Sequence, residues 1–261
     1  MSKVRDVTGE DLADEFDRAA DRYDLLTRLN PGYHAALRRA AAELVGRLRV
    51  GMPGPLTLWD LGCGSGLSTR ALLDTAGEDA QVTGLDASAG MLSQARAKAW
   101  AAGVTFVQGM AQDLPELATD AGVGPADGAF AAYLMRNVPE DQRDEVVAAI
   151  RDQVRPGGWI ALQDYHVKGD RRASAVWTAV CWGVVTPLAV VVRGNPAIYR
   201  YLWRSVLAND STAELQGRLE RAGLTDITWR TAGGWQRGIL HTVLARRPET
   251  SPHGDQRGDQ P

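Results

Sequence analysis

Short apolar runs alternate with amphipathic segments along most of the chain. Between residues 56 and 165, five runs rich in aliphatic, small and aromatic residues alternate with segments whose apolar positions recur every three or four residues. The first pattern is typical of buried strands and the second of helices packed on one face. We predict strands at 56–62, 80–86, 104–109, 127–134 and 159–165, with helices at 66–77, 88–103 and 140–154. The alternation predicts an α/β fold with an open, doubly wound and mostly parallel sheet.

The alternation does not extend over the whole chain. Residues 10–48 have helical spacing throughout. After residue 210 the alternation returns, with a predicted helix at 211–223 and strands at 224–233 and 238–247, so that seven strands are predicted in all. We predict an N-terminal helical cap over 1–50, one α/β domain over 51–247, and an apolar helical lid inserted after the fifth strand at 166–210. The polar tail, 248–261, is rich in Pro and Gly and is expected to be disordered.

One uncharged stretch, 173–192, is long enough to raise the question of a membrane span. Gly183 and Pro187 interrupt the stretch, and no second span accompanies it. We therefore favour a buried or lid-forming pair of helices over a transmembrane helix.

Composition and charge exclude several classes of function. The net charge of −3 shows no basic excess, so a nucleic-acid partner is not expected. The cysteines, Cys63 and Cys181, form neither a disulfide framework nor a metal-binding set, and no metal is predicted. The charged N-terminus lacks an apolar signal core, so a cytoplasmic location is expected.

A glycine-rich loop, "DLGCGSG" at 60–66, follows the first predicted strand. The second strand ends at Asp86, twenty residues beyond Gly66, where an acid can accept hydrogen bonds from ribose hydroxyls. The spacing of its glycines differs from that of dinucleotide-binding loops and from that of triphosphate-binding loops. The remaining candidate ligand is a nucleoside without a pyrophosphate. Asp60 suits a ligand that carries a positive charge, such as the sulfonium and ammonium groups of S-adenosylmethionine. The alternative is a glycine turn that binds nothing.

These segments resemble the class I S-adenosylmethionine-dependent methyltransferases. "LWDLGCGSG" looks like their first motif, "GLDASAGML" like their second, "GMAQDLP" like their third, and "RPGGWIAL" like the turn before their fifth strand. The resemblance implies their Rossmann-like fold and S-adenosylmethionine as cofactor, with Asp86 on the ribose and Met91 near the adenine. The cofactor-binding residues that it implies are Asp60, Gly62, Gly64, Gly66, Asp86, Ala87, Met91, Met110, Ala111 and Gln112. Met110 stands where the family often has an acid.

Three further segments resemble the ubiquinone/menaquinone biosynthesis C-methyltransferases. They are "FDRAADRYDLLTRL", "LMRNVPE" and "YRYLWRSV". We expect Tyr23, in the first of these segments, to close over the cofactor; the alternative is an aromatic residue that packs the N-terminal helix on the sheet. The resemblance implies that a carbon of an apolar aromatic or quinol, such as demethylmenaquinol, is methylated. The alternative is a specialised-metabolite methyltransferase that acts on carbon, oxygen or nitrogen of a bulky apolar scaffold. Peripheral membrane contact, for access to the substrate, and a homodimer are compatible with either reading.

Polar residues after the fourth and fifth strands are the candidate catalytic residues. Ligands in such sheets bind beyond the carboxyl ends of the strands, which is where Arg136, Asn137 and His166 follow. Arg136 can stabilise an oxyanion, Asn137 can orient a ligand, and His166 has a suitable pKa range for a general base. The alternatives are a salt bridge from Arg136 to Glu140 or Asp141 and a solvent-exposed histidine. Four aromatic residues either line an apolar substrate pocket or form the core of the lid: Trp177, Trp182, Tyr199 and Trp203.

Overall fold

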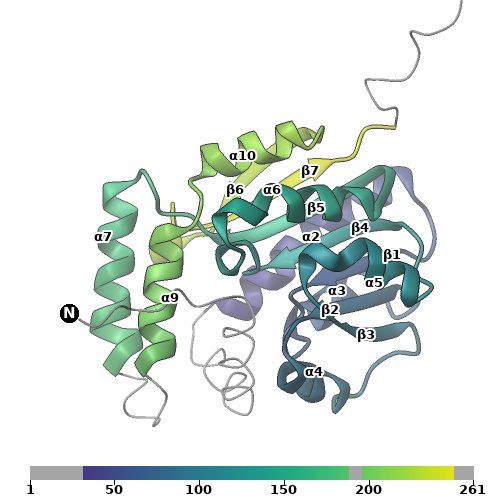
Figure 1. The fold of residues 1–261 in the computed structure, drawn as a ribbon, viewed down its shortest axis with the longest axis horizontal. Helices are drawn as coiled ribbons and strands as arrows, with labels where there is room; N and C mark the ends of the chain where they lie inside the picture. Colours follow the sequence, from purple (N-terminus) through teal and green to yellow (C-terminus); the bar gives the residue numbers. More distant parts are fainter. Residues whose placement is uncertain (1–31, 188–195, 250–261) are drawn as a thin grey trace, which may run out of the picture.

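The computed structural model describes residues 32–187 and 196–249, which build a seven-stranded sheet with helices on both faces (Figure 1). The strand order is β3-β2-β1-β4-β5-β7-β6, and β7 is antiparallel to its neighbours β5 and β6. The strands are β1 (Thr57–Leu61), β2 (Gln81–Asp86), β3 (Val104–Gln108), β4 (Ala126–Ala132), β5 (Val154–Tyr165), β6 (Thr225–Thr231) and β7 (Leu240–Arg246). The predicted open, mostly parallel and doubly wound sheet is confirmed.

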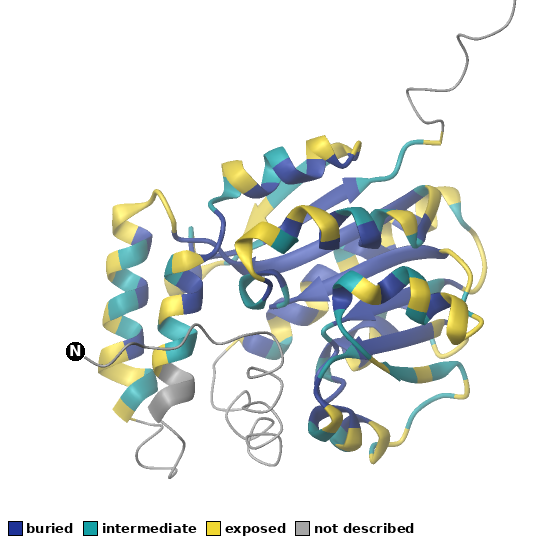
Figure 2. Ribbon diagram, in the orientation of Figure 1, coloured by how far each residue is buried: buried dark blue, intermediate teal, exposed yellow. Residues whose placement is uncertain are grey.

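Two apolar cores lie on opposite faces of the sheet. The helices α2 (Tyr33–Gly51) and α3 (Leu67–Ala76) contribute to one core, and α5 (Leu114–Asp120), α6 (Arg143–Asp152) and α10 (Thr212–Arg221) contribute to the other. Because both faces are covered, every residue of β4 is buried, and the inner strands of the sheet are mostly dark blue in Figure 2, unlike the edge strands β3 and β6.

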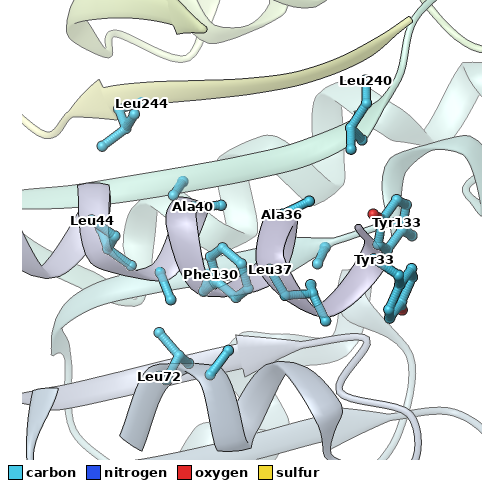
Figure 3. Packing of buried hydrophobic residues seen from close by; sticks show 14 of the residues in the cluster. Tyr33, Ala36, Leu37, Ala40, Leu44, Leu72, Phe130, Tyr133, Leu240 and Leu244 are labelled. Carbon is cyan, nitrogen blue, oxygen red and sulfur yellow. The ribbon is translucent and has the colours of Figure 1, made fainter. Parts of the chain in front are cut away.

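Helix α2 belongs to the main core of the domain. Its apolar residues recur at helical spacing, and Ala36, Leu37, Ala40 and Leu44 face Phe130 of β4 (Figure 3). Of the predicted helical cap at 1–50, residues 33–50 therefore pack against the sheet as an ordinary layer of the fold. Residues 1–31 lie outside the described part of the chain, as do 188–195 and nearly all of the predicted tail at 248–261.

The prediction of a helix over 88–103 is wrong at its C-terminal end, because α4 spans only Ala89–Arg96. The helix starts as expected, where the Ser88 side chain accepts a hydrogen bond from the backbone nitrogen of Met91. It ends early because the Trp100 indole nitrogen donates to the carbonyl oxygen of Ala95 at 2.7 Å. The Trp100 ring then packs beside Gly66 and under the guanidinium of Arg70.

The insertion after β5 contains two helices that lie side by side at one end of the molecule, α7 (Arg171–Val180) and α9 (Pro196–Ala208) (Figure 1). The indole nitrogen of Trp203 on α9 donates to the Thr178 hydroxyl on α7 at 3.1 Å. A π-helical segment, Cys181–Val185, continues α7. Across 32–187 and 196–249, no helix combines the length and the apolar character that crossing a membrane requires.

Candidate functional site

A cavity that opens into solvent lies at the carboxyl ends of β1, β2, β3 and β4. Ten of the residues predicted for the site line it: Gly62, Gly64, Asp86, Ala87, Met91, Met110, Ala111, Gln112, Arg136 and Asn137. These residues follow four different strands, and the parallel sheet brings them together because its strand ends share one edge.

The glycine loop brings its backbone to the wall of this cavity. Gly64 has φ +53°, a left-handed conformation that side chains rarely adopt, and a Cβ there would lie 3.0 Å from the Met91 side chain. Gly66 also has a positive φ, of +86°, but it faces a side chain of the protein, because a Cβ at Gly66 would lie 2.7 Å from the Trp100 ring. Gly64 therefore lines the cavity, whereas Gly66 begins α3 beneath Trp100 and is not part of the wall.

Asp86 joins the glycine loop to the start of α4. Its Oδ2 accepts a hydrogen bond from the Gly64 backbone nitrogen at 2.7 Å, and its Oδ1 accepts one from the Ser88 backbone nitrogen at 2.9 Å. Asp86 also lines the cavity, and a carboxylate at this position is the kind of acceptor that a ribose diol requires.

Asp60 does not line the cavity. It is fully buried, and its Oδ2 accepts hydrogen bonds from the hydroxyls of Ser68 at 2.8 Å and Thr69 at 2.6 Å. Its Oδ1 is buried with no hydrogen-bond partner among the described residues. Burial raises the pKa of Asp60 from 3.8 to about 7, although the two hydroxyls act in the opposite direction. The structure thus places Asp60 as an anchor between β1 and α3, away from the cavity wall.

Arg136 and Asn137 lie in a single 3₁₀ turn, Met135–Asn137, that follows β4. The turn begins after Tyr133, which has a left-handed φ of +60°. Arg136 pairs with Asp164 at the end of β5: the Arg136 backbone nitrogen donates to Oδ2 at 3.0 Å, and Nε lies 3.4 Å from Oδ1. Its Nη1 donates to Asn137 Oδ1 at 3.0 Å.

This arrangement differs from the alternative expected from sequence, a salt bridge to Glu140 or Asp141. Asp164 is the partner because β4 and β5 are neighbours in the sheet, whereas Glu140 and Asp141 are exposed on the next turn. The side chains of Arg136 and Asp164 are only 8% and 2% exposed. Separation of a buried ion pair is unfavourable because it leaves a buried charge unpaired. The pair with Asp164 therefore holds the guanidinium of Arg136 at the cavity.

His166 lies apart from the cavity. Its ring is buried, and Nδ1 lies 2.8 Å from the carbonyl oxygen of Asp210. The rings of Trp229 and His241 pack against it with centroids 5.9 Å away. The alternative of a solvent-exposed loop histidine is therefore wrong, and His166 does not line the cavity as a catalytic residue would. We therefore interpret His166 as a buried structural residue.

The aromatic residues of the insertion also do not line the cavity. Trp177 is buried against Tyr165, with centroids 4.8 Å apart, and Trp182 packs edge-on against Trp203 at 5.9 Å. The contact between Trp182 and Trp203 matches the alternative of a core within the insertion, whereas Trp177 packs against the end of β5. Tyr23 and the side chain of Tyr199 lie outside the described part of the structure.

Several wall residues escaped the sequence analysis. They are Leu85, Ser88, Gly109, Ala132, Tyr133, Leu134, Val138 and Pro139. The ring of Tyr133 stacks on Tyr33 of α2, with centroids 5.1 Å apart and an interplanar angle of 14°. The sequence offered one signal for Tyr133, which is that it lies only three positions before Arg136. Its contact with Tyr33 could not be predicted in this way, because the two residues are 100 positions apart and meet only through packing.

Comparison with known proteins gives a consistent result. Residues 59–158 match a methyltransferase domain family. The chain is 31% identical to a demethylmenaquinone methyltransferase of Mycolicibacterium vanbaalenii over 233 residues, which covers 86% of this chain and 90% of that protein. It is 30% identical to a ubiquinone/menaquinone biosynthesis C-methyltransferase of Methylobacterium nodulans, with 84% of each chain covered.

Solved structures show the same fold at lower identity. The magnesium protoporphyrin IX methyltransferase of Synechocystis PCC 6803 with bound S-adenosylhomocysteine (SAH) superposes with a TM-score of 0.63 at 18% identity. The match covers 92% of this chain and 100% of that one. A Burkholderia thailandensis 1,6-didemethyltoxoflavin-N1-methyltransferase gives a TM-score of 0.59 at 16% identity, over 95% and 93% of the two chains.

The carboxylate of Asp86 leads to a prediction about cofactor binding. Asp86→Ala removes the acceptor that faces the cavity, so the dissociation constant for SAH should rise about tenfold to a hundredfold. Isothermal titration calorimetry measures this constant. Asp120→Ala, at the exposed end of α5, is the matched control and should leave it unchanged. Equal affinity of Asp86→Ala and the wild type would exclude a role in ribose recognition.

The raised pKa of Asp60 leads to a prediction about stability. The unfolded chain releases the proton near pH 4, whereas the folded protein holds it to about pH 7, so this contribution to stability is lost as the pH rises between these values. Between pH 5 and pH 7 the loss is roughly 2 to 3 kcal/mol. Urea unfolding should show that Asp60→Asn loses less stability than the wild type over this range, while Asp120→Asn follows the wild type. Parallel curves for Asp60→Asn and the wild type would contradict a neutral Asp60.

Proposed function

This chain belongs to the family of demethylmenaquinone and ubiquinone/menaquinone biosynthesis methyltransferases, which makes it an S-adenosylmethionine-dependent methyltransferase, and we propose that it methylates a ring carbon of an apolar quinol such as demethylmenaquinol. One observation carries the choice of a phenolic acceptor. Arg136 lines the same cavity as the proposed ribose acceptor Asp86, so a positive charge lies where an oxyanion of the substrate would form.

The residues of the cavity fit S-adenosylmethionine. Asp86 offers acceptors to the ribose, Gly64 allows close approach of the backbone, and Met91 with Met110, Ala111 and Gln112 forms the wall proposed for the adenine. When bound, this cofactor supplies a methyl group that is activated by the positive sulfur. Asp60 contributes indirectly, because its bonds to Ser68 and Thr69 hold the start of α3 against the glycine loop.

Arg136 serves the acceptor rather than the donor. As a quinol hydroxyl loses its proton, negative charge spreads onto the adjacent ring carbon, and a guanidinium in a partly dry cavity stabilises the oxyanion. When bound, S-adenosylmethionine would supply the methyl group to this ring carbon, and the ring proton would pass to solvent water as the ring regains aromaticity. Arg136 itself is not the base, because a guanidinium stays protonated in proteins. Together with Asn137 it orients a water that takes the hydroxyl proton.

The insertion suggests how an apolar substrate reaches the protein. Trp182 is 49% exposed and Val184 is 59% exposed, and both lie in the π-helical segment after α7. Exposed tryptophan beside aliphatic residues suits the interface between lipid headgroups and acyl chains. We propose that this segment contacts a membrane surface, from which a quinol enters.

Flotation with neutral phosphatidylcholine vesicles tests this contact. A fraction of the protein should float with the vesicles, and the double variant Trp182→Gln with Val184→Gln should lose that fraction. Val50→Gln, at an 88% exposed apolar position on α2, is the matched control and should bind as the wild type does. Equal flotation of all three proteins, or none, would contradict the assignment. Sedimentation of the same wild-type preparation measures whether the expected homodimer forms.

The proposed reaction is tested in a bacterial strain that lacks the menaquinone methyltransferase. The wild-type chain should convert demethylmenaquinone into menaquinone, with a gain of one methyl group in the quinone pool by mass spectrometry. Arg136→Ala should lower turnover of purified enzyme about a hundredfold or more, because it removes the stabilising charge. Its affinity for SAH should stay near that of the wild type.

Arg155→Ala is the matched control for the loss of an ion pair. Arg155 pairs with the buried Asp127 at 2.9 Å, outside the cavity, so its variant should keep wild-type turnover. Turnover of Arg136→Ala equal to that of Arg155→Ala would make Arg136 structural. An unchanged quinone pool with an expressed wild-type chain would favour the specialised-metabolite alternative, to which Met110, in place of the acid often found there, already points.

A further inference from the structure

A tyrosine of the insertion reaches the residues at the end of β4. Tyr201 lies on α9, and its hydroxyl donates a hydrogen bond to Asn137 Oδ1 at 3.2 Å. The two residues are 64 positions apart in sequence. Tyr201 does not line the cavity, whereas Asn137 does. This bond therefore joins the helical insertion directly to the wall of the site.

Both ends of the Asn137 amide are engaged. Oδ1 accepts from Arg136 Nη1 at 3.0 Å as well as from Tyr201, and Nδ2 donates to the Tyr133 carbonyl oxygen at 3.1 Å. Two donors converge on one oxygen, so the reversed amide would place its NH₂ group against both of them. Arg136 and Tyr201 thereby select one orientation of the Asn137 side chain, and that side chain in turn holds one nitrogen of the guanidinium.

The Tyr201 hydroxyl is placed to donate to Asn137. Burial raises the pKa of Tyr201 above its ordinary value, while the nearby positive charge of Arg136 acts in the opposite direction. The hydroxyl thus keeps its proton across the neutral range and can donate it to Asn137. On the other side of the guanidinium, Asp164 Oδ1 lies 3.4 Å from Nε in an ion pair, so oppositely placed groups attract Arg136 from two directions.

We propose that Tyr201 is a positioning residue of methyl transfer: through Asn137 it holds the Arg136 guanidinium at the cavity, and it makes the insertion part of the catalytic apparatus. The proposal rests on the proposed role of Arg136. Tyr201 touches neither substrate nor cofactor, so its effect must pass through Asn137. It also gives the insertion a function besides access of the substrate, since movement of α9 would alter the placement of the charge.

Kinetics of Tyr201→Phe test this role. Loss of one neutral hydrogen bond should lower kcat about threefold to tenfold, with the affinity for SAH unchanged. Thr178→Val is the matched control, because it removes a hydrogen bond of similar length, 3.1 Å, between α7 and the same helix α9, without touching Asn137. In an Asn137→Ala background, Tyr201→Phe should produce no further loss of kcat. Equal kcat for Tyr201→Phe and the wild type, or additive losses in the double variant, would overturn the proposal.

A second measurement separates this proposal from the proposed reaction. Exchange of the Arg136 Nε proton with water, followed by nuclear magnetic resonance in arginine-labelled protein without substrate, reports how firmly the guanidinium is held. The exchange rate should rise severalfold in Tyr201→Phe and stay at the wild-type value in Thr178→Val. An unchanged rate in Tyr201→Phe would overturn the positioning role. A wild-type chain that methylates no quinol but shows this rise would refute the proposed substrate while supporting the role of Tyr201.

Discussion

Close packing around the central strand β4 is the constraint on which the rest of the structure depends. All of its residues are buried, and most are small, "ADGAFAA". A Cβ at Gly128 would lie 2.9 Å from the Leu48 side chain of α2 and 3.0 Å from the Trp159 carbonyl oxygen of β5. The small residues therefore let α2 approach β4, and they place β4 between β1 and β5 in register. That order brings Arg136, the glycine loop and Asp164 to one edge of the sheet.

Carboxylates at strand ends convert this edge into a site. Asp60, Asp86 and Asp164 each lie in or at the end of a parallel strand, and each accepts hydrogen bonds from a neighbouring segment. Their environments separate their roles. Asp60 is fully buried and its pKa is raised, Asp86 faces the cavity, and Asp164 is matched by the cation of Arg136. Three aspartates therefore have three different roles: Asp60 anchors the glycine loop, Asp86 faces the cavity, and Asp164 pairs with the guanidinium of Arg136.

The same sheet explains why some predictions from sequence were wrong. Trp100 ends α4 early because its indole bonds to Ala95 and packs beside Gly66, a contact that helical periodicity does not contain. His166 was a candidate catalytic residue because it follows the fifth strand, at the edge of the sheet where ligands bind. Instead it is buried against Asp210, Trp229 and His241. Position at the end of a strand indicates the edge of the sheet, but the direction of the next turn decides whether a side chain reaches the cavity.

The amino-acid sequence by itself determined the fold class and most of the wall of the cavity. Strand–helix alternation and the spacing from Gly62 to Asp86 are local properties, and a parallel sheet has few ways to join such elements. Only the tertiary structure decided the partners of Arg136 and Asn137. Asp164 lies 28 positions from Arg136 and Tyr201 lies 64 positions from Asn137, and nothing in the local pattern pairs them. Hydrogen bonds between distant side chains depend on the relative placement of whole elements, which packing of both cores sets.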